Sequence, residues 1–403
     1  MALAVEAMQP RGIDRGRAIL AMLGVATVTE AMLLLLPIYV GAISDGLALT
    51  QSQVGLLGSA DLAGIAASTL SAAWWVRRIA WRETILGLIG AFFLANLASV
   101  WTQSFEPLLV LRVFAGVAAG AAYAIALAGL CDTLRSERNA ALMVCGQVLF
   151  GAAGSFILPL VGSDWQVGAV FLYMNLWVAA AWLVAFLAFP AEPGIHSVHG
   201  GLRWRSLAAR GPVVVLGTGA YFLTIGMVWA YLERVVRAAG MSSQEVALSL
   251  GVGYLISIAG SLAAAWLGSR LGRALPMLVA GSVQIAMLVL FSRLQSFDDV
   301  AAAFFAINIV FQFFWSYIIA YQIVIYSDVD RSGRFVATYG TSMHLALAVG
   351  PYAGSRLVAG TDYTAVLDAG VWTLALCYGC FLLAVYLNRQ GRAAAGSFGQ
   401  PVS

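Results

Sequence analysis

The sequence predicts an all-α membrane protein with twelve transmembrane helices in two pseudo-symmetric six-helix halves. Of its 403 residues 61% are hydrophobic and only 10% are charged, and the mean hydropathy is +0.88. A soluble domain of ordinary composition carries far more charge. About twelve apolar stretches, each close to the ~20 residues that a helix needs to cross a bilayer, follow one another along the chain. One long polar break divides these stretches six and six.

Short polar breaks set the bounds of the expected spans, because each break ends an apolar run that is long enough to cross. The spans are expected at residues 18–41, 53–75, 83–102, 108–130, 140–162, 167–189, 213–232, 246–268, 275–293, 300–325, 335–358 and 365–387. Nearly the whole length is used in crossing, which argues against a soluble catalytic domain. The sequence also lacks a metal-ligand cluster, a nucleophile elbow and a phosphate loop. We therefore expect neither an enzyme nor a cofactor.

The distribution of arginines predicts the orientation of the chain. The net charge is only +3, which does not suggest a nucleic-acid partner. Most arginines fall in the tails and in alternate breaks, as the positive-inside rule requires of short cytoplasmic loops. We expect a multi-pass protein of a bacterial inner membrane with both termini cytoplasmic.

Two repeated segments indicate that the halves are parallel copies of one unit. The segments at 50–54 and 242–246 both carry the helix-start pattern Ser/Thr-x-x-Glu/Gln and are 192 residues apart. The segments at 132–138 and 328–334 share Asp, Arg, Ser and Arg in the same order and are 196 residues apart. Parallel halves of this kind are related by an axis along the membrane normal. We expect an N-terminal half, a cytoplasmic linker and a C-terminal half at residues 1–189, 190–212 and 213–403.

Three sequence features resemble one transporter family. The loop at 268–273 reads Gly-Ser-Arg-Leu-Gly-Arg, and the loop at 75–82 stands at the matching place in the first half. Both are similar to the loop signature of the major facilitator superfamily, and the resemblance covers the full length of the chain. Both lack the aspartate of that signature, with Arg77 and Ser269 at its positions, which weakens the expectation of the family's inner charge-relay latch. Arg112 with Gly116 resembles the family's Arg-x-x-x-Gly pattern, which is associated with proton coupling.

A looser similarity concerns the fifth span. Gly146, Gln147, Gly151, Gly154 and Pro159 form a glycine and proline pattern similar to one in exporters of the family. Glycine and proline are also common in membrane helices for packing reasons alone.

Four ionisable residues inside the expected spans are candidates for proton coupling: Glu30, Asp61, Arg112 and His344. An ionisable group at the bilayer centre costs about 2.5–3.5 kcal/mol on insertion scales, so each one requires a reason. Glu30 is the first choice, because its helix face carries small and polar neighbours that suit a cavity; a structural hydrogen bond is the alternative. Asp61 and Arg112 have similar depths and are candidates for an ion pair, either coupling or static. His344 titrates in the useful range, and a hydrogen-bonded core histidine is its alternative reading.

Polar and aromatic residues of three spans are candidates for substrate contact. They are Tyr123, Phe222, Trp229, Asn308, Gln312, Trp315 and Gln322. The four between 308 and 322 lie within about 40° of one line at 100° per residue, which suits the wall of a wet cavity. The resemblance implies that the first, fourth, seventh and tenth helices line a central cavity, and these residues lie on the last three of them. Aromatic packing and interface anchoring are the alternative.

The favoured hypothesis is a secondary active transporter of a small organic molecule, coupled to protons and working by alternating access. The central Glu30 favours export of a drug or metabolite by proton antiport. A proton-coupled importer of an organic or aromatic acid would instead be suited by Arg112 with Asn308, Gln312 and His344. An alternative of another class is a membrane sensor or assembly factor that does not transport. The expected partners are the substrate, protons and the lipid bilayer, with the chain acting as a monomer.

Overall fold

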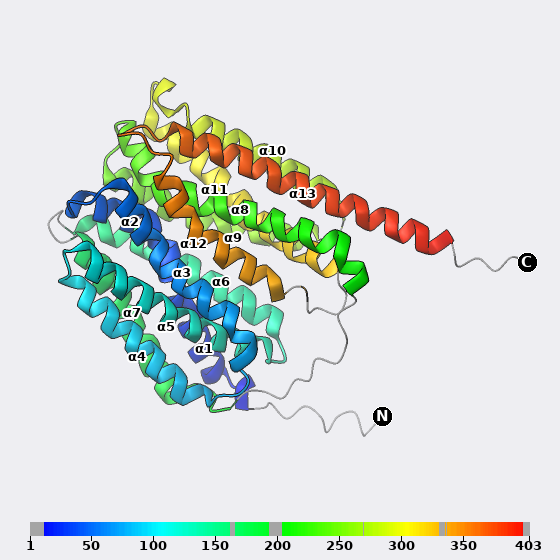
Figure 1. Cartoon of the computed structure of the whole chain (residues 1–403), viewed down its shortest axis with the longest axis horizontal. Helices are drawn as coiled ribbons and strands as arrows, with labels where there is room; N and C mark the ends of the chain where they lie inside the picture. Colours follow the sequence, from blue (N-terminus) through cyan, green and yellow to red (C-terminus); the bar gives the residue numbers. More distant parts are fainter. Residues whose placement is uncertain are drawn as a thin grey trace, which may run out of the picture. The chain divides into compact units, whose positions relative to one another are not determined.

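The described part of the chain folds into helices, and the predicted all-α class is confirmed (Figure 1). The computed structural model describes residues 12–161, 166–192, 204–268, 270–329, 335 and 337–397. The chain divides into two compact units. Unit 1 comprises Met1–Ala48 and Ala60–Val198, and unit 2 comprises Leu49–Ser59 and His199–Ser403.

Seven α-helices lie in the described residues of the first part of the chain. They are α1 (Gly16–Thr29), α2 (Ala31–Gly46), α3 (Gln51–Trp75), α4 (Trp81–Val100), α5 (Phe105–Cys131), α6 (Ser136–Ile157) and α7 (Gln166–Ala188). Short 3-10 helices at Gly12–Asp14 and Leu158–Leu160 precede α1 and follow α6. The first turns of α3, up to Ser59, are grouped with unit 2.

In unit 2, as far as the structure describes it, six α-helices follow. They are α8 (Trp204–Ala238), α9 (Ser243–Leu267), α10 (Ala274–Phe291), α11 (Val300–Val329), α12 (Ala337–Ser355) and α13 (Thr364–Ser397). A 3-10 helix at Leu294–Ser296 follows α10. Among the described residues, eleven segments are long and apolar enough to cross a membrane, and the first consists of α1 and α2 together. The polar residues of α12 lower its hydropathy, and α12 is not one of the eleven.

One expectation about a helix was wrong. The first span was predicted as one helix over 18–41, but the helix is interrupted at Glu30, where φ is −97° and ψ is 8°. The preceding Thr29 donates its hydroxyl to the Val25 carbonyl at 2.9 Å, a back-bond of the kind that bends helices. The linker expected at 190–212 stays a prediction, and α8 begins within it at Trp204. Residues 193–203 of that linker lie outside the described part of the chain.

Both predicted helix-start boxes are present. The Ser242 hydroxyl accepts from the Glu245 amide, and the Glu245 carboxylate accepts from the Ser242 amide at 2.8 Å. Thr50 and Gln53 make the same two bonds at the start of α3. Because each box satisfies two of the amides that a helix start leaves free, the repeated pattern marks the same point in both repeats.

Small residues set the closest helix crossings in each unit. In unit 1 a Cβ on Gly116 of α5 would lie 2.8 Å from the Asp61 carbonyl carbon in α3. The Ser68 hydroxyl of α3 donates to the Val117 carbonyl of α5 at 2.8 Å. In unit 2 a Cβ on Gly226 of α8 would lie 2.9 Å from the Gly350 Cα of α12. Backbones approach this closely in membrane helices only where side chains are absent or small.

Candidate functional site

A charged cluster lies in the interior of unit 1. The Arg112 side chain of α5 is fully buried, and one terminal nitrogen lies 3.4 Å from Oδ1 of Asp61 in α3. The same nitrogen donates to Asn96 Oδ1 at 2.9 Å, and the other donates to the Ser99 hydroxyl at 2.7 Å. The guanidinium carbon stands 4.4 Å from the centre of the Phe171 ring. We call Asp61, Asn96, Ser99 and Arg112 the arginine cluster.

In the arginine cluster, the Arg112 guanidinium interacts mostly with neutral partners. The bonds to Asn96 and Ser99 are shorter than the contact with Asp61, and the Phe171 ring adds a cation–π contact. The expected ion pair between Asp61 and Arg112 is therefore present. Its partners from α4 and α7 were missed, because neutral side chains in apolar helices give no charge signal in the sequence.

Glu30 lies in a second polar region of unit 1. It stands at the break between α1 and α2 and is 4% exposed. The Tyr123 side chain of α5 lies within electrostatic range of Glu30 and forms a hydrogen bond with the Gln147 side chain of α6. The Gln147 amide also donates to the Ala26 carbonyl of α1 at 3.1 Å. The structure thus brings a proton-coupling candidate together with a substrate candidate and with a residue of the fifth-span pattern.

One face of α11 carries polar atoms without protein partners. The Asn308 amide nitrogen donates to the Ser249 carbonyl of α9 at 2.8 Å, but its Oδ1 has no partner among the described residues. The same holds, within the described chain, for Gln312 Nε2 and for the indole nitrogen of Trp315. A buried donor without an acceptor costs about 1–3 kcal/mol. These atoms are therefore the strongest candidates in unit 2 for binding a polar ligand group.

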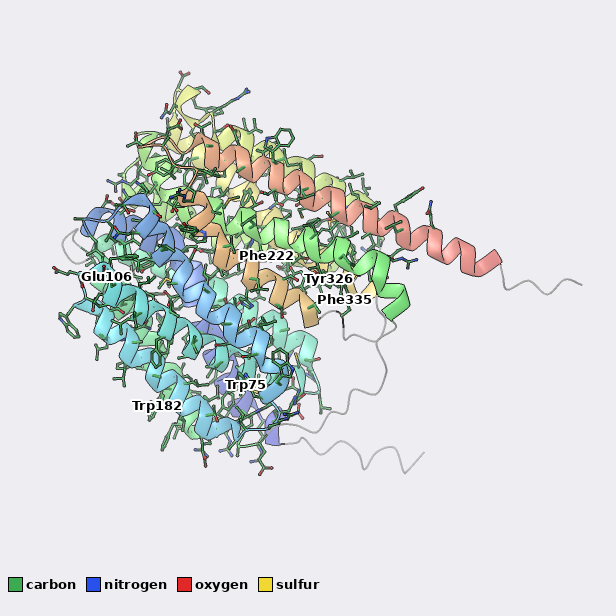
Figure 2. The ribbon with its side chains drawn as sticks, viewed as in Figure 1. Trp75, Glu106, Trp182, Phe222, Tyr326 and Phe335 are labelled. Atoms are coloured by element: carbon green, nitrogen blue, oxygen red, sulfur yellow. The ribbon has the colours of Figure 1, made fainter. Side chains whose placement is uncertain are left out.

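The remaining α11 candidate belongs to a different cluster. Gln322 is buried, and its Oε1 accepts from the Tyr339 hydroxyl of α12 at 3.2 Å. Tyr339 packs edge-on against Phe222 of α8 and Tyr326 of α11, with ring centres 6.0 and 5.4 Å apart. Figure 2 shows Phe222 and Tyr326 close together in unit 2, beside Phe335. The predicted stripe therefore divides, with Asn308 bound to α9 and Gln322 bound to α12.

The two other candidates of unit 2 are buried as well. Trp229 of α8 packs edge-on against Tyr254 of α9, with ring centres 5.7 Å apart. His344 of α12 is 2% exposed. Gly226, one turn before Trp229, faces α12 and serves the close crossing with Gly350.

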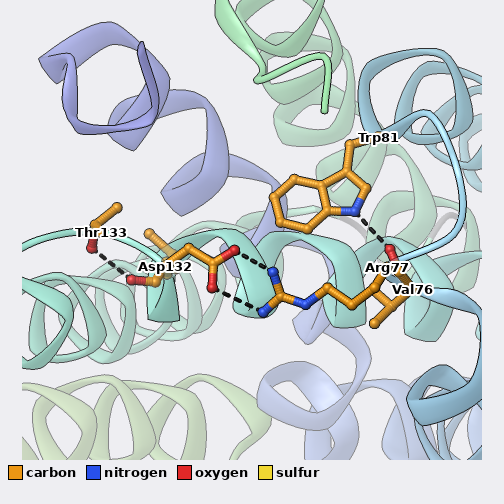
Figure 3. Close-up of polar contacts among 6 residues, drawn as sticks. Val76, Arg77, Trp81, Asp132 and Thr133 are labelled. Atoms are coloured by element: carbon orange, nitrogen blue, oxygen red, sulfur yellow. Dashed lines mark hydrogen bonds and ion pairs between the residues drawn. The ribbon is translucent and has the colours of Figure 1, made fainter. Parts of the chain in front are cut away.

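Each repeat also has an ion pair at its loop. In unit 1 both terminal nitrogens of Arg77 bind the carboxylate of Asp132 at the end of α5, one of them at 2.8 Å (Figure 3). Hydrogen bonding to Asp132 raises the pKa of the Arg77 guanidinium above its ordinary value. In unit 2 the Arg273 Nε lies 3.4 Å from Asp328. Arg77, which stands where the family signature has aspartate, therefore forms an ion pair with the end of the fourth span.

The arrangement agrees with a family match over most of the chain. The family model of the Major Facilitator Superfamily matches residues 18–351. The chain belongs to the major facilitator superfamily. It is accordingly a multi-pass membrane transporter of small organic molecules and not an enzyme.

Two curated members of the superfamily are similar in sequence. The 3-(3-hydroxy-phenyl)propionate transporter of Escherichia coli (strain K12) is 25% identical over 342 residues, which cover 82% of this chain and 84% of that protein. The 4-hydroxybenzoate transporter PcaK of Pseudomonas putida is 25% identical over 283 residues, which cover 60% and 62%. The chain thus spans less than two thirds of the second relative.

Solved structures of the superfamily share the fold. A D-xylose-proton symporter superposes with a TM-score of 0.70, over 92% of this chain and 96% of that one, at 13% sequence identity. An identity this low concerns the fold alone.

Proposed function

We propose that this superfamily member imports an aromatic carboxylic acid together with a proton. The substrates for which the two relatives are named are hydroxylated aromatic acids. Each combines a flat ring with a hydroxyl and a carboxylate. We therefore favour proton-coupled import of an acid over export by proton antiport.

The observation that carries the proposal is the pair of buried donors on α11. Gln312 Nε2 and the Trp315 indole nitrogen have no acceptor in the described part of the chain, although unpaired buried donors are costly. The two residues lie three positions apart on one face of α11, so both side chains can reach the same ligand group. A carboxylate or a phenol oxygen accepts such bonds, and the paired Trp229 and Tyr254 rings of the same unit suit an aromatic body.

We infer proton coupling because a site made of these donors carries no positive charge to balance a carboxylate. Amide and indole donors are neutral, so a bound carboxylate anion would bring uncompensated charge into an apolar unit. The guanidinium of Arg112 is already bound to Asp61, Asn96 and Ser99, so we assign it no direct role in neutralising the substrate. Carrying a proton with each acid removes this cost. Glu30 remains the first candidate for the proton site, with Asp61 and His344 as alternatives.

Purified protein in proteoliposomes tests the direction and the coupling. With 4-hydroxybenzoate and 3-(3-hydroxyphenyl)propionate outside, an acidic exterior should drive accumulation above equilibrium. Accumulation driven by an acidic interior would instead establish antiport. Benzyl alcohol, which has the ring without the carboxylate, serves as the control substrate.

A binding measurement separates transport from substrate identity. A ligand that binds the folded state raises the melting temperature of the detergent-purified protein. Stabilisation by the aromatic acids without uptake in the vesicles would favour a non-transporting sensor. If neither acid stabilises the protein or accumulates, the aromatic-acid proposal fails.

Glu30→Gln in the same vesicles tests the proton site. A neutral glutamine imitates the protonated carboxyl, so proton-driven accumulation should be lost while exchange of labelled for unlabelled substrate persists. Asp61→Asn is the matched comparison. Wild-type pH dependence in Glu30→Gln would assign Glu30 a structural role.

A further inference from the structure

We propose that unit 1 binds the headgroup of an anionic phospholipid in a cavity at the N-terminal end of α1. The cavity has a volume of about 600 Å³. Its lining includes Arg15, Arg17, Arg82, Ile13, Leu187 and Phe189. It therefore combines three cations with an apolar wall, which is the chemistry of a lipid phosphate joined to its acyl chains.

The cavity lies at the depth where phosphates are found. It is formed where α1 begins at Gly16, where α4 begins at Trp81 and where α7 ends at Ala188. All three positions are ends of membrane-spanning segments. Helix ends at the bilayer surface meet the headgroup layer, and each arginine there attracts anionic lipid.

The net charge of the side chains that line the cavity is positive once the carboxylate already bound by an arginine is set aside. Asp132, which also lines it, is bound by both terminal nitrogens of Arg77. Glu192 on the rim is exposed and is the one other lining carboxylate among the described residues. Within that part of the chain Arg15 and Arg17 form no ion pair. Three guanidinium groups thus face one carboxylate that is not held elsewhere.

The start of α1 adds to this positive potential. Arg15 is the N-cap residue, and no side chain caps the helix. The first amides of a helix and its dipole favour an anion at this point. A phosphate in the cavity would therefore be bound by helix amides as well as by arginines.

An apolar strip on α7 leads to the cavity. Leu183, Phe186 and Leu187 are 55%, 47% and 65% exposed. Trp182, at the outer edge of unit 1 in Figure 2, stacks on Phe186 with ring centres 5.6 Å apart. Arg82 lies against the other end of this strip, because its guanidinium donates to the Phe186 carbonyl and lies 5.9 Å from the Phe186 ring. A lipid whose phosphate binds in the cavity can lay its acyl chains along these side chains.

Native mass spectrometry of the detergent-purified full chain tests the proposal. Phosphatidylglycerol and phosphatidylcholine with identical acyl chains are offered in equal amounts, and the bound fraction of each is measured. Wild type should retain phosphatidylglycerol preferentially. Because each arginine contributes about fivefold near an anionic lipid, Arg15→Gln/Arg17→Gln should lower this preference by at least that factor. Both arginines are exposed, so the variant should fold normally.

Arg270→Gln is the matched control. Arg270 also rests on an exposed ring near a helix end, 5.3 Å from the centre of Trp266, but it does not line the cavity. Its substitution should leave the lipid preference unchanged. Arg82→Gln provides a second variant inside the cavity and should act as the double variant does.

Three results would overturn the proposal. Equal retention of the two lipids by wild type would mean that the headgroup is not recognised. If Arg270→Gln lost as much of the preference for phosphatidylglycerol, that preference would come from the overall surface charge and not from the cavity. Displacement of phosphatidylglycerol by millimolar inorganic phosphate, with no lipid preference left, would identify a site for free phosphate.

Discussion

The two repeats place different chemistry at matching positions of the same helix crossing. With the 192-residue offset between α3 and α9, Asp61 corresponds to Gly253. With the 196-residue offset between α5 and α11, Arg112 corresponds to Asn308. The contacts agree with these offsets, because a Cβ on Gly253 would lie 2.6 Å from Asn308 Nδ2, as Asp61 lies against Arg112.

This difference shows that the crossing itself does not depend on charge. Unit 1 buries an ion pair that needs Asn96 and Ser99 to complete its hydrogen bonds. Unit 2 forms the crossing with a glycine and a neutral amide, and Asn308 completes it by bonding to Ser249. Buried ion pairs seldom add net stability over neutral packing, so the charge in unit 1 points to a functional requirement. Under the proposed function, the neutral crossing leaves the α11 donors available to a ligand.

The largest expected effect on stability comes from removing one partner of the buried ion pair between Asp61 and Arg112. Arg112→Gln leaves Asp61 buried without a cation, a loss of about 3–5 kcal/mol in stability. Asn308→Ala, at the matching position, should cost about 1 kcal/mol, because it removes a neutral hydrogen bond. Thermal unfolding of the purified variants in detergent measures both. The double variant Asp61→Asn/Arg112→Gln should recover most of the loss, and an Arg112→Gln protein as stable as wild type would contradict the comparison.

Alanine substitutions at the two crossings should differ in cost. At Gly116 the new methyl group would meet the Asp61 backbone, which cannot move without displacing α3. At Gly253 it would meet Asn308 Nδ2 and Gln312 Cγ, which belong to side chains and can move without displacing a helix. Overpacking costs about 1–3 kcal/mol, and we expect Gly116→Ala near the upper end and Gly253→Ala near the lower. The reverse order of melting temperatures would show that the helices can separate at little cost.

The donors on α11 allow a separation of binding from stability. Gln312→Leu removes an amide donor that has no partner in the described chain, so the substrate Kd should rise about tenfold while stability is unchanged or improved. Gln284→Leu is the control, because the Gln284 amide is bound by both Tyr221 and Tyr378. That substitution should lower the melting temperature. Ligand titration and thermal unfolding of both variants test this pair, and unchanged affinity in Gln312→Leu would make the α11 face a packing surface.

The smallest effect is expected at the loop ion pairs. Arg77 binds an almost fully buried Asp132 with two nitrogens, whereas Arg273 Nε lies 3.4 Å from Asp328 and both of those side chains are 27% exposed. Exposed pairs contribute about 0–1 kcal/mol, so Arg77→Gln should cost about 1 kcal/mol and Arg273→Gln less. Double-mutant cycles with Asp132→Asn and Asp328→Asn measure each coupling. Equal couplings would show that burial of the aspartate does not matter here.

Much of the fold was open to prediction because it rests on local physics. Apolar length alone locates membrane helices, and capping boxes mark their starts, as at Thr50 and Ser242. The repeat offsets were visible for the same reason, since equivalent loops keep equivalent caps and charges. The ion pair between Asp61 and Arg112 followed from depth, because two lone charges in apolar helices at one level need each other.

Only the tertiary structure decided which residues complete these sites. Helical periodicity assigns residues to a face, but the rotation of each helix against its neighbours depends on packing along its whole length. For that reason Asn96, Ser99 and Phe171 could not be assigned to Arg112, and the α11 stripe could not be divided between α9 and α12. The break at Glu30 was hidden as well, because an apolar run of sufficient length predicts a crossing and not its straightness. The sequence by itself determined the class, the repeat and the charged candidates, and packing between helices determined their partners.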